Sequence, residues 1–212
     1  MTAISRSLTA LALLFVGSLA PFATAMAIEE APFRTIASDG PFEIREYAPY
    51  LVAETYVEGG FGEVGNEGFR RLFRYISGDN AKAQSIAMTA PVEQTAASEK
   101  IAMTAPVEQQ RSGERWRIAF VLPALYTLET APKPLDPRVT VVAMPARRMA
   151  AVRYSGTWSE SRYDEQLASL AKFVSDRGLS PEGEPVFARY DPPFMPWFLR
   201  RNEILVPVRR DP

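Results

Sequence analysis

The chain of 212 residues carries 24 Lys and Arg against 25 Asp and Glu, and it contains neither histidine nor cysteine. The two missing residue types exclude Ser-His-acid and Cys-His nucleophiles, zinc sites built from imidazole or thiolate, and disulfides. The nearly balanced charge argues against a nucleic-acid partner.

Residues 1–27 have the pattern of a secretory signal peptide. One basic residue precedes an apolar run over residues 8–20, and the small residues Ala25 and Ala27 come just before the expected cleavage point. The run is shorter than the roughly 20 apolar residues that a membrane span requires, which disfavours the alternative of a membrane anchor. We therefore expect export to the periplasm or beyond the cell, and no stable membrane insertion after cleavage.

One domain is expected over residues 28–208, with residues 209–212 as a short C-terminal tail. Its first elements are two short strands, because residues 42–57 alternate apolar with polar or small side chains on either side of a turn at Pro49. An apolar stripe with helical spacing then predicts a helix near residues 64–77. The stripe consists of Phe69, Leu72, Phe73 and Ile76.

The same order of elements returns about 97 residues further along the chain. Strands are expected at 139–142 and 149–154, followed by a helix near 160–177 that Ser159 or Ser161 caps. Two copies of a strand-strand-helix unit would pack about a pseudo-twofold axis, each helix covering part of the sheet, in an α+β arrangement. The alternative is that the similar order is a coincidence.

Between the two units, the sequence IAMTAPVEQ occurs at residues 86–94 and again at 101–109. Turn-like segments separate the two copies from each other and from a strand expected at 116–122. We therefore expect a meander, in which the prolines of the repeat restrict their segments to sheet edges or bulges. Further strands are expected at 186–190 and 203–208.

The segment between these last two strands is dense in proline and in large apolar residues. From Asp191 to Leu199 it reads DPPFMPWFL. The prolines stiffen this segment, so that it presents bulky side chains in a fixed arrangement. Two interpretations follow: the side chains plug the open end of the sheet as core, or they wall a pocket for a flat apolar ligand.

Other patterns are weaker guides to chemistry. Residues 60–65 match the dinucleotide fingerprint G-x-G-x-x-G, but Glu63 would bring a negative charge to the pyrophosphate and no parallel strand follows. Glu63 lies near Glu54, Glu58 and Glu67 in the chain, and all of them are expected on a solvated face. These carboxylates are not assigned a catalytic role.

Pairs of arginines are scattered along the chain and are expected to be solvated surface, with a basic binding patch as the disfavoured alternative. They lie at residues 70–71, 147–148, 200–201 and 209–210. No catalytic residue and no metal ligand can be assigned from these patterns. A binding protein is therefore favoured over an enzyme.

Three segments of the chain resemble the SOUL haem-binding protein family. They are IAMTAPV at 101–107, WRIAFVLP at 116–123 and ARYDPPFMPWFLRRNE at 188–203. The last segment is long and ordered, and the similarity runs from about Ile28 to Val208.

The resemblance implies a distorted antiparallel β-barrel flanked by two helices, with internal pseudo-twofold symmetry. It also implies that haem or a related tetrapyrrole lies in a shallow hydrophobic groove between the first helix and the loop before the last strand. Carried over to this chain, the helix would contribute Phe69 and Phe73 as apolar wall and Arg74 as the partner of a propionate carboxylate. The loop would contribute Phe194, Met195 and Trp197.

The lack of histidine leaves haem iron without an imidazole ligand, so that only Met, Tyr, Lys or water could hold it, if anything does. Affinity would then come mainly from burial of the macrocycle, at roughly 25 cal/mol per Å² before the costs of association. The resulting prediction is an exported carrier, buffer or scavenger of haem or porphyrin. The alternatives are a module for another planar or lipophilic molecule, an enzyme that modifies a bound tetrapyrrole, and a module that binds protein partners.

Overall fold

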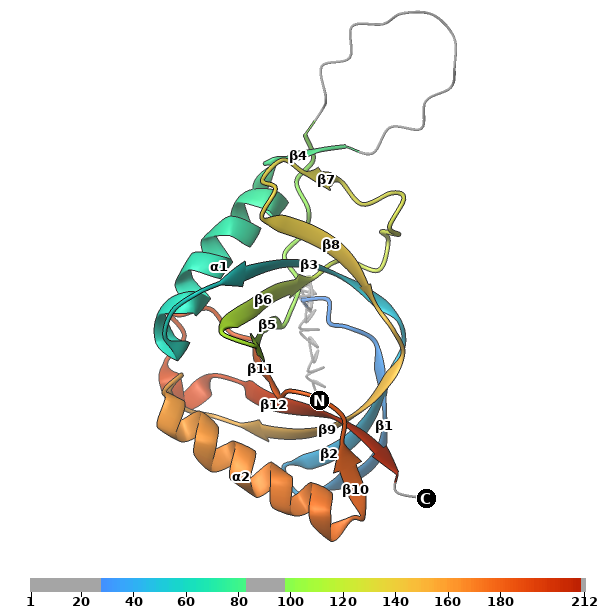
Figure 1. Ribbon diagram of the computed structural model, residues 1–212, viewed down its shortest axis with the longest axis vertical. Coiled ribbons are helices and arrows are strands. Elements are labelled where there is room, and N and C mark those ends of the chain that lie inside the picture. Colours follow the sequence, from blue (N-terminus) through green and yellow to red (C-terminus); the bar gives the residue numbers. More distant parts are fainter. Residues whose placement is uncertain (1–27, 83–97, 211–212) are drawn as a thin grey trace, which may run out of the picture.

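A computed structural model describes residues 28–82 and 98–210 (Figure 1). The expected signal peptide at 1–27 and the first copy of the repeat at 86–94 lie outside the described residues. The elements in chain order are β1 (Phe33–Asp39), β2 (Phe42–Tyr47), β3 (Tyr50–Val57), α1 (Phe61–Ser77), β4 (Asn80–Ala81), β5 (Val107–Ser112), β6 (Arg115–Val121), β7 (Lys133–Pro134), β8 (Val139–Met144), β9 (Arg147–Tyr154), α2 (Glu160–Asp176), β10 (Leu179–Pro181), β11 (Val186–Arg189), the 3-10 helix η1 (Trp197–Leu199) and β12 (Asn202–Arg210).

Ten strands form one antiparallel sheet in the order β1-β2-β9-β12-β11-β5-β6-β3-β8, with β10 beside β12, while β4 and β7 form a separate pair. Strands β2 and β3 follow one another in the chain, but the chain changes direction between them near Pro49, whose nitrogen cannot donate a hydrogen bond to a strand ladder. The chain changes direction in the same way between β8 and β9, near Pro145. Through these bends β2 pairs with β9 while β3 pairs with β8. The result is the strongly curled sheet of Figure 1.

The expectation of a β-barrel is wrong, because this sheet is open. A closed barrel requires a ladder between its first and last strands. Within the described residues, however, β1 pairs only with β2 and β8 only with β3. The coarser prediction of an α+β fold with a large antiparallel sheet and two helices is confirmed. The internal duplication stays a prediction.

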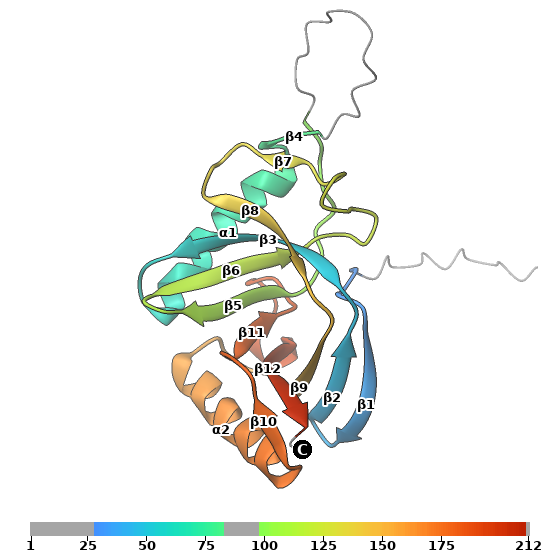
Figure 2. The ribbon, with the colours of Figure 1, turned by 45° about the vertical axis from the view of Figure 1, so that its right-hand side comes forward.

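Both helices lie close to their expected positions (Figure 2). Helix α1 packs on β3 and β6, and α2 packs on β9, β10 and β12. Ser159 caps α2, since its side chain accepts a hydrogen bond from the backbone N–H of Arg162, whereas Ser161 lies inside the helix. Gly78 follows α1 with a φ of 127°, a conformation that glycine adopts without strain. In the described part of the chain, neither helix is long and apolar enough to cross a bilayer.

The close approach of α1 to the sheet depends on Gly68. A Cβ atom at this position would lie 2.4 Å from Cγ1 and 2.6 Å from Cβ of Ile118 on β6. Ile118 is fully buried, so it has little room to move away. Glycine therefore sets the distance between helix and sheet, and with it the position of the side chains on the outer face of α1.

Buried side chains form two clusters on opposite faces of the sheet. One cluster contains residues of both helices and of the strands beneath them. The other contains residues of the strands and of the segment before β1. Neighbours along one strand, such as Ala151 and Val152 of β9, belong to different clusters, as the two-residue period of a strand requires. The helices thus cover one face, and the curl of the sheet encloses the other.

Candidate functional site

Two of the three predicted helix residues form an aromatic ledge on α1, defined here as Phe69 and Phe73. They lie one helical turn apart and stack with their ring centroids 5.8 Å apart. Phe69 also contacts Phe120 of β6 edge-on at 5.2 Å, whereas Phe73 is 44% exposed. The ledge is therefore anchored in the core at one end and offers an aromatic surface to solvent at the other.

Arg74, the third predicted helix residue, already has an acidic partner. Its guanidinium lies 2.7 Å from Oδ2 of Asp79, just beyond the end of α1, and its side chain is 67% exposed. A carboxylate ligand would have to compete with Asp79 and with water for this guanidinium. Arg74 alone therefore offers only a weak contact to an anionic group.

The three predicted loop residues lie between β11 and β12, in a loop whose backbone is held by polar contacts. Arg200 donates hydrogen bonds to the carbonyl oxygens of Met195, at 2.8 Å, and Pro193, at 2.6 Å. Asp191 accepts a hydrogen bond from the backbone N–H of Arg201 at 2.5 Å. These bonds, together with the prolines, fix the path of the loop.

The apolar side chains of this loop point mainly to solvent. Phe194 is 85% exposed and Trp197 is 57% exposed, and Phe198 and Leu199 are exposed as well. Met195 is half-buried. The interpretation of the loop as a core plug is therefore wrong for the four exposed side chains, because none of them is covered by the sheet. A dense group of exposed apolar residues on a stiff loop is typical of a binding surface.

Trp158 connects this loop to the beginning of α1. The guanidinium of Arg200 lies 4.4 Å from the centre of the Trp158 ring, and that of Arg189 lies 4.9 Å from it. Arg189 also reaches α1, because a Cβ atom at Gly65 would lie 2.7 Å from its Nη1. The loop, Trp158, Arg189 and the first turns of α1 therefore form one continuous region.

Arg189 is a largely buried cation with no carboxylate partner among the described residues. Its Nη2 donates to Oε1 of Gln109 at 2.8 Å, while its Nε has no partner. Burial lowers the pKa of Arg189 to about 10, so the guanidinium is charged at neutral pH. An uncompensated buried charge is costly, and an anionic ligand would relieve that cost.

Sequence reasoning did not single out Arg189 or Trp158 as site residues. Within the described chain, no hydrogen bond, ion pair or ring contact joins the predicted helix residues to the predicted loop residues. The groove between these two groups stays a prediction.

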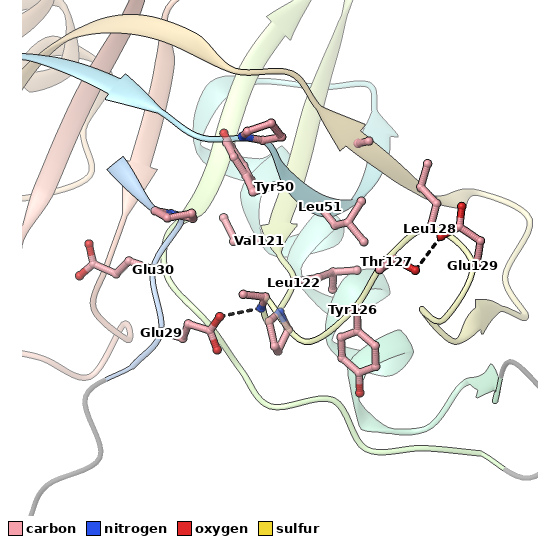
Figure 3. A pocket seen from close by; sticks show the side chains of 15 residues that line it. Glu29, Glu30, Tyr50, Leu51, Val121, Leu122, Tyr126, Thr127, Leu128 and Glu129 are labelled. Atoms are coloured by element: carbon pink, nitrogen blue, oxygen red, sulfur yellow. Dashed lines mark hydrogen bonds between the residues drawn. The ribbon is translucent and has the colours of Figure 1, made fainter. Parts of the chain in front are cut away.

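A separate pocket of about 310 Å³ contains none of the six predicted residues (Figure 3). Apolar side chains such as Leu51 and Leu122 form its middle, and Glu29 and Glu129 lie toward its two ends. Its lining includes a third carboxylate, Glu30, and no lysine or arginine. An acidic lining repels the carboxylates of a tetrapyrrole, so this pocket does not fit such a ligand.

The deeply buried carboxylates belong to compensated ion pairs. Glu203 accepts hydrogen bonds from Arg45 at 2.6 and 3.1 Å and from Tyr190 at 2.8 Å. Burial alone would raise the pKa of Glu203, but the hydrogen bonds and charge of Arg45 outweigh burial and hold that pKa below its usual value. The expectation that Glu54 lies on a solvated face is wrong, because Glu54 is buried and paired with Arg117.

In the part of the chain that the structure describes, no group of three or more acidic side chains is placed to hold a metal ion. The buried carboxylates Glu54, Glu108 and Glu203 are each bound by an arginine.

Comparisons with known proteins show a family, curated relatives and a similar solved structure. Residues 28–207 match the family model described as SOUL heme-binding protein. Heme-binding protein 2 of Homo sapiens is 26% identical over 196 residues, which cover 90% of this chain and 91% of that protein. Heme-binding protein 1 of Xenopus laevis is 27% identical over 164 residues, or 77% of this chain and 81% of that protein. The solved C-terminal domain of EcmrR has a similar fold, with a TM-score of 0.58 at 12% identity over 80% of this chain and 98% of that one.

Proposed function

This chain belongs to the SOUL heme-binding protein family, and we propose that it binds haem or a related tetrapyrrole. Its curated relatives carry the names of heme-binding proteins, and the acidic side chains in its interior are compensated rather than free to react. The proposed role is that of a carrier, buffer or scavenger, and not that of an enzyme.

The proposed site is the surface formed by the aromatic ledge of α1, Arg74 and the loop residues Phe194, Met195 and Trp197. One observation carries it: exposed aromatic side chains occur in the same region as Arg189, a charged group that lacks a carboxylate partner within the described residues. A flat macrocycle can lie against aromatic faces, and its carboxylates can accept hydrogen bonds from guanidinium groups. The combination fits a tetrapyrrole better than it fits a neutral lipid.

The residues of this site offer no strong ligand for iron. The chain has no histidine or cysteine, and the loop contributes one thioether, that of Met195. The protein therefore recognises the shape and the carboxylates of the macrocycle, and iron is carried as cargo. Iron-free porphyrin should bind in the same place and by the same contacts.

We also propose that the protein acts outside the cytoplasm. The support is the signal-peptide pattern of residues 1–27, with its short apolar run and the small residues before the expected cleavage point. Fractionation of cells that produce the full chain would test this: the proposal requires a shortened protein in the exported fraction, and an intact chain in the cytoplasm would contradict it.

The location of the site can be tested by placing a charge on the aromatic ledge. Phe73→Asp should weaken hemin binding at least tenfold, because the carboxylate would meet both an apolar surface and the ligand's own carboxylates. Leu125→Asp is the matched control, since Leu125 is 72% exposed and lies outside the proposed site. Hemin titrations should show a loss for the first variant alone, with thermal unfolding confirming that both are folded. Equal affinities of Phe73→Asp and the wild type would place the ligand elsewhere.

Two ligands that differ only in their carboxylates can show whether Arg189 binds a carboxylate of the tetrapyrrole. Arg189→Gln should weaken protoporphyrin binding but leave binding of its dimethyl ester unchanged, because the ester has no carboxylate for the guanidinium to bind. An equal loss for both ligands would mean that Arg189 shapes the site and does not contact the carboxylate.

A further inference from the structure

Arginines that are far apart in the sequence meet in a hollow of about 620 Å³ at the rim of the sheet. They are Arg34 of β1, Arg147 and Arg148 at the start of β9, and Arg209 near the end of β12. The ladder explains this, because β1 pairs with β2, β2 with β9, and β9 with β12 (Figure 1). Arg147, Arg148 and Arg209 thus come from arginine pairs that are scattered along the sequence, and the fold brings them to one place.

The guanidinium groups of this basic hollow are only partly compensated. Glu46 is the carboxylate in its lining, and its two oxygens lie 2.6 Å from Arg34 and 2.8 Å from Arg148. Arg147 has no acidic partner in the described ranges: its Nη2 donates to the hydroxyl of Tyr50 at 2.7 Å, and its Nε has no partner.

Arg209, the fourth guanidinium, lies 3.6 Å from Glu182, which is outside the lining of the hollow. Glu46 and Glu182 carry two negative charges, whereas the four arginines carry four positive charges, so two positive charges are unmatched. The whole chain has a net charge of −1, so this excess is a local feature and not a consequence of a basic protein.

We propose that the basic hollow binds a polyvalent oxyanion of the phosphate type, carried by a soluble molecule or by a lipid headgroup. The fork of N–H donors on a guanidinium matches the oxygens of a phosphate group, and two unmatched charges are neutralised by a dianion. Glu46 holds Arg34 and Arg148 side by side, one on each oxygen, so part of the site is ordered before the ligand arrives.

This site is independent of the proposed tetrapyrrole site. None of the helix or loop residues assigned to the tetrapyrrole lines the basic hollow. Arginine variants in the hollow should therefore leave hemin affinity unchanged, and loss of the tetrapyrrole function would not bear on the anion site.

Calorimetric titration of the purified protein with inorganic pyrophosphate at low ionic strength tests the proposal. The wild type should show saturable binding that weakens as sodium chloride is added, since the contacts are exposed ion pairs. Arg147→Gln should reduce the affinity at least tenfold. Arg153→Gln is the matched control on the same strand, because Arg153 is exposed and lies outside the hollow, and it should change the affinity less than twofold.

A second variant covers the case in which Arg147→Gln disturbs folding through Tyr50. Arg209 is 65% exposed on its side chain, so Arg209→Gln should keep the fold while weakening pyrophosphate binding several-fold. Absence of saturable binding by the wild type, or an equal loss in the Arg153→Gln control, would overturn the proposal.

Sedimentation with lipid vesicles distinguishes phosphate on a lipid headgroup from phosphate on a soluble molecule. Sedimentation with phosphatidylglycerol vesicles but not with phosphatidylcholine vesicles, reversed by pyrophosphate, would identify a lipid headgroup as the ligand. Pyrophosphate binding without sedimentation would identify a soluble ligand, and either pattern supports the site. Sedimentation that Arg147→Gln and Arg209→Gln leave unchanged would contradict it.

Discussion

Replacing Gly68 with alanine should destabilise the protein, although alanine favours helices. In the interior of a helix, alanine is more stable than glycine by about 1 kcal/mol. Against this gain, the new Cβ would lie 2.4 Å from Cγ1 of Ile118, well inside the contact distance of about 3.5 to 4.0 Å between carbon atoms. Overpacking costs about 1 to 3 kcal/mol, and the stiff, fully buried Ile118 places this case at the upper end. The expected net loss is about 1 to 2 kcal/mol in the free energy of unfolding.

Urea denaturation followed by circular dichroism would measure this loss. Gly62→Ala is the matched control in the same helix, because the new Cβ would meet nothing within 4 Å apart from its chain neighbours and the backbone of its own helix, and it should stabilise the protein by up to about 1 kcal/mol. In an Ile118→Gly background, Gly68→Ala should cost much less, since the Cβ and both γ carbons that the new methyl group would meet are gone. If Gly68→Ala proved as stable as Gly62→Ala, the reasoning about how α1 is positioned would be refuted.

The remaining predictions concern individual ion pairs and one buried tyrosine. Asp79→Ala should strengthen hemin binding a few-fold by freeing the guanidinium of Arg74, whereas Arg74→Ala should weaken it by up to about fivefold; hemin titrations giving the opposite order would contradict the assignment of Arg74. Arg45→Met should lower the free energy of unfolding by roughly 2 to 3 kcal/mol in urea denaturation, because the buried Glu203 would lose the hydrogen bonds of Arg45 and keep only those of Arg201 and Tyr190; a loss under about 1 kcal/mol would contradict that role. Burial raises the pKa of Tyr47 to about 12, whereas an unfolded tyrosine has a pKa of about 10. The folded state therefore holds this proton more tightly, and the stability it contributes is complete below pH 10 and is lost as the pH rises toward 12. Tyr47→Phe should flatten the fall in stability over that range, and an unchanged profile would count against the explanation.

The helices could be predicted because each buries an apolar stripe of regular spacing. In α1, Leu72 and Ile76 are buried as the stripe requires. The same spacing could not show that Phe73 is 44% exposed, because the apolar stripe is wider than the face that packs on the sheet. Phe69 still packs on the sheet, and Phe73 is the part of the stripe that does not.

Strand β1 was not predicted, because it is an edge strand with no deeply buried face. Its residues are exposed or half-buried, and Ile36 is 45% exposed, so the alternation that marks a half-buried strand is missing. Glu54 was misplaced for the opposite reason. Strand β3 is largely buried on both faces, and the partner of Glu54 is Arg117, which comes from β6.

The candidate site could be predicted only in part. The sequence places Phe194 and Trp197 on a proline-rich loop, but their exposure depends on how Arg200 holds the backbone of that loop. Arg189 and Trp158 lie on separate elements and meet only in the folded protein, so no pattern of residue spacing predicts their contact. The basic hollow likewise follows from strand pairing, which local patterns do not specify.

Comparison of hemin with iron-free protoporphyrin tests the central claim most directly. Both ligands should be titrated into the purified protein while visible absorption and tryptophan fluorescence are recorded. Recognition by shape and carboxylates predicts saturable binding of both, with Kd values within about threefold of each other, because no imidazole or thiolate adds an iron bond. A large preference for hemin together with a six-coordinate low-spin spectrum would contradict this account, and so would the absence of saturable uptake of either ligand at micromolar concentrations.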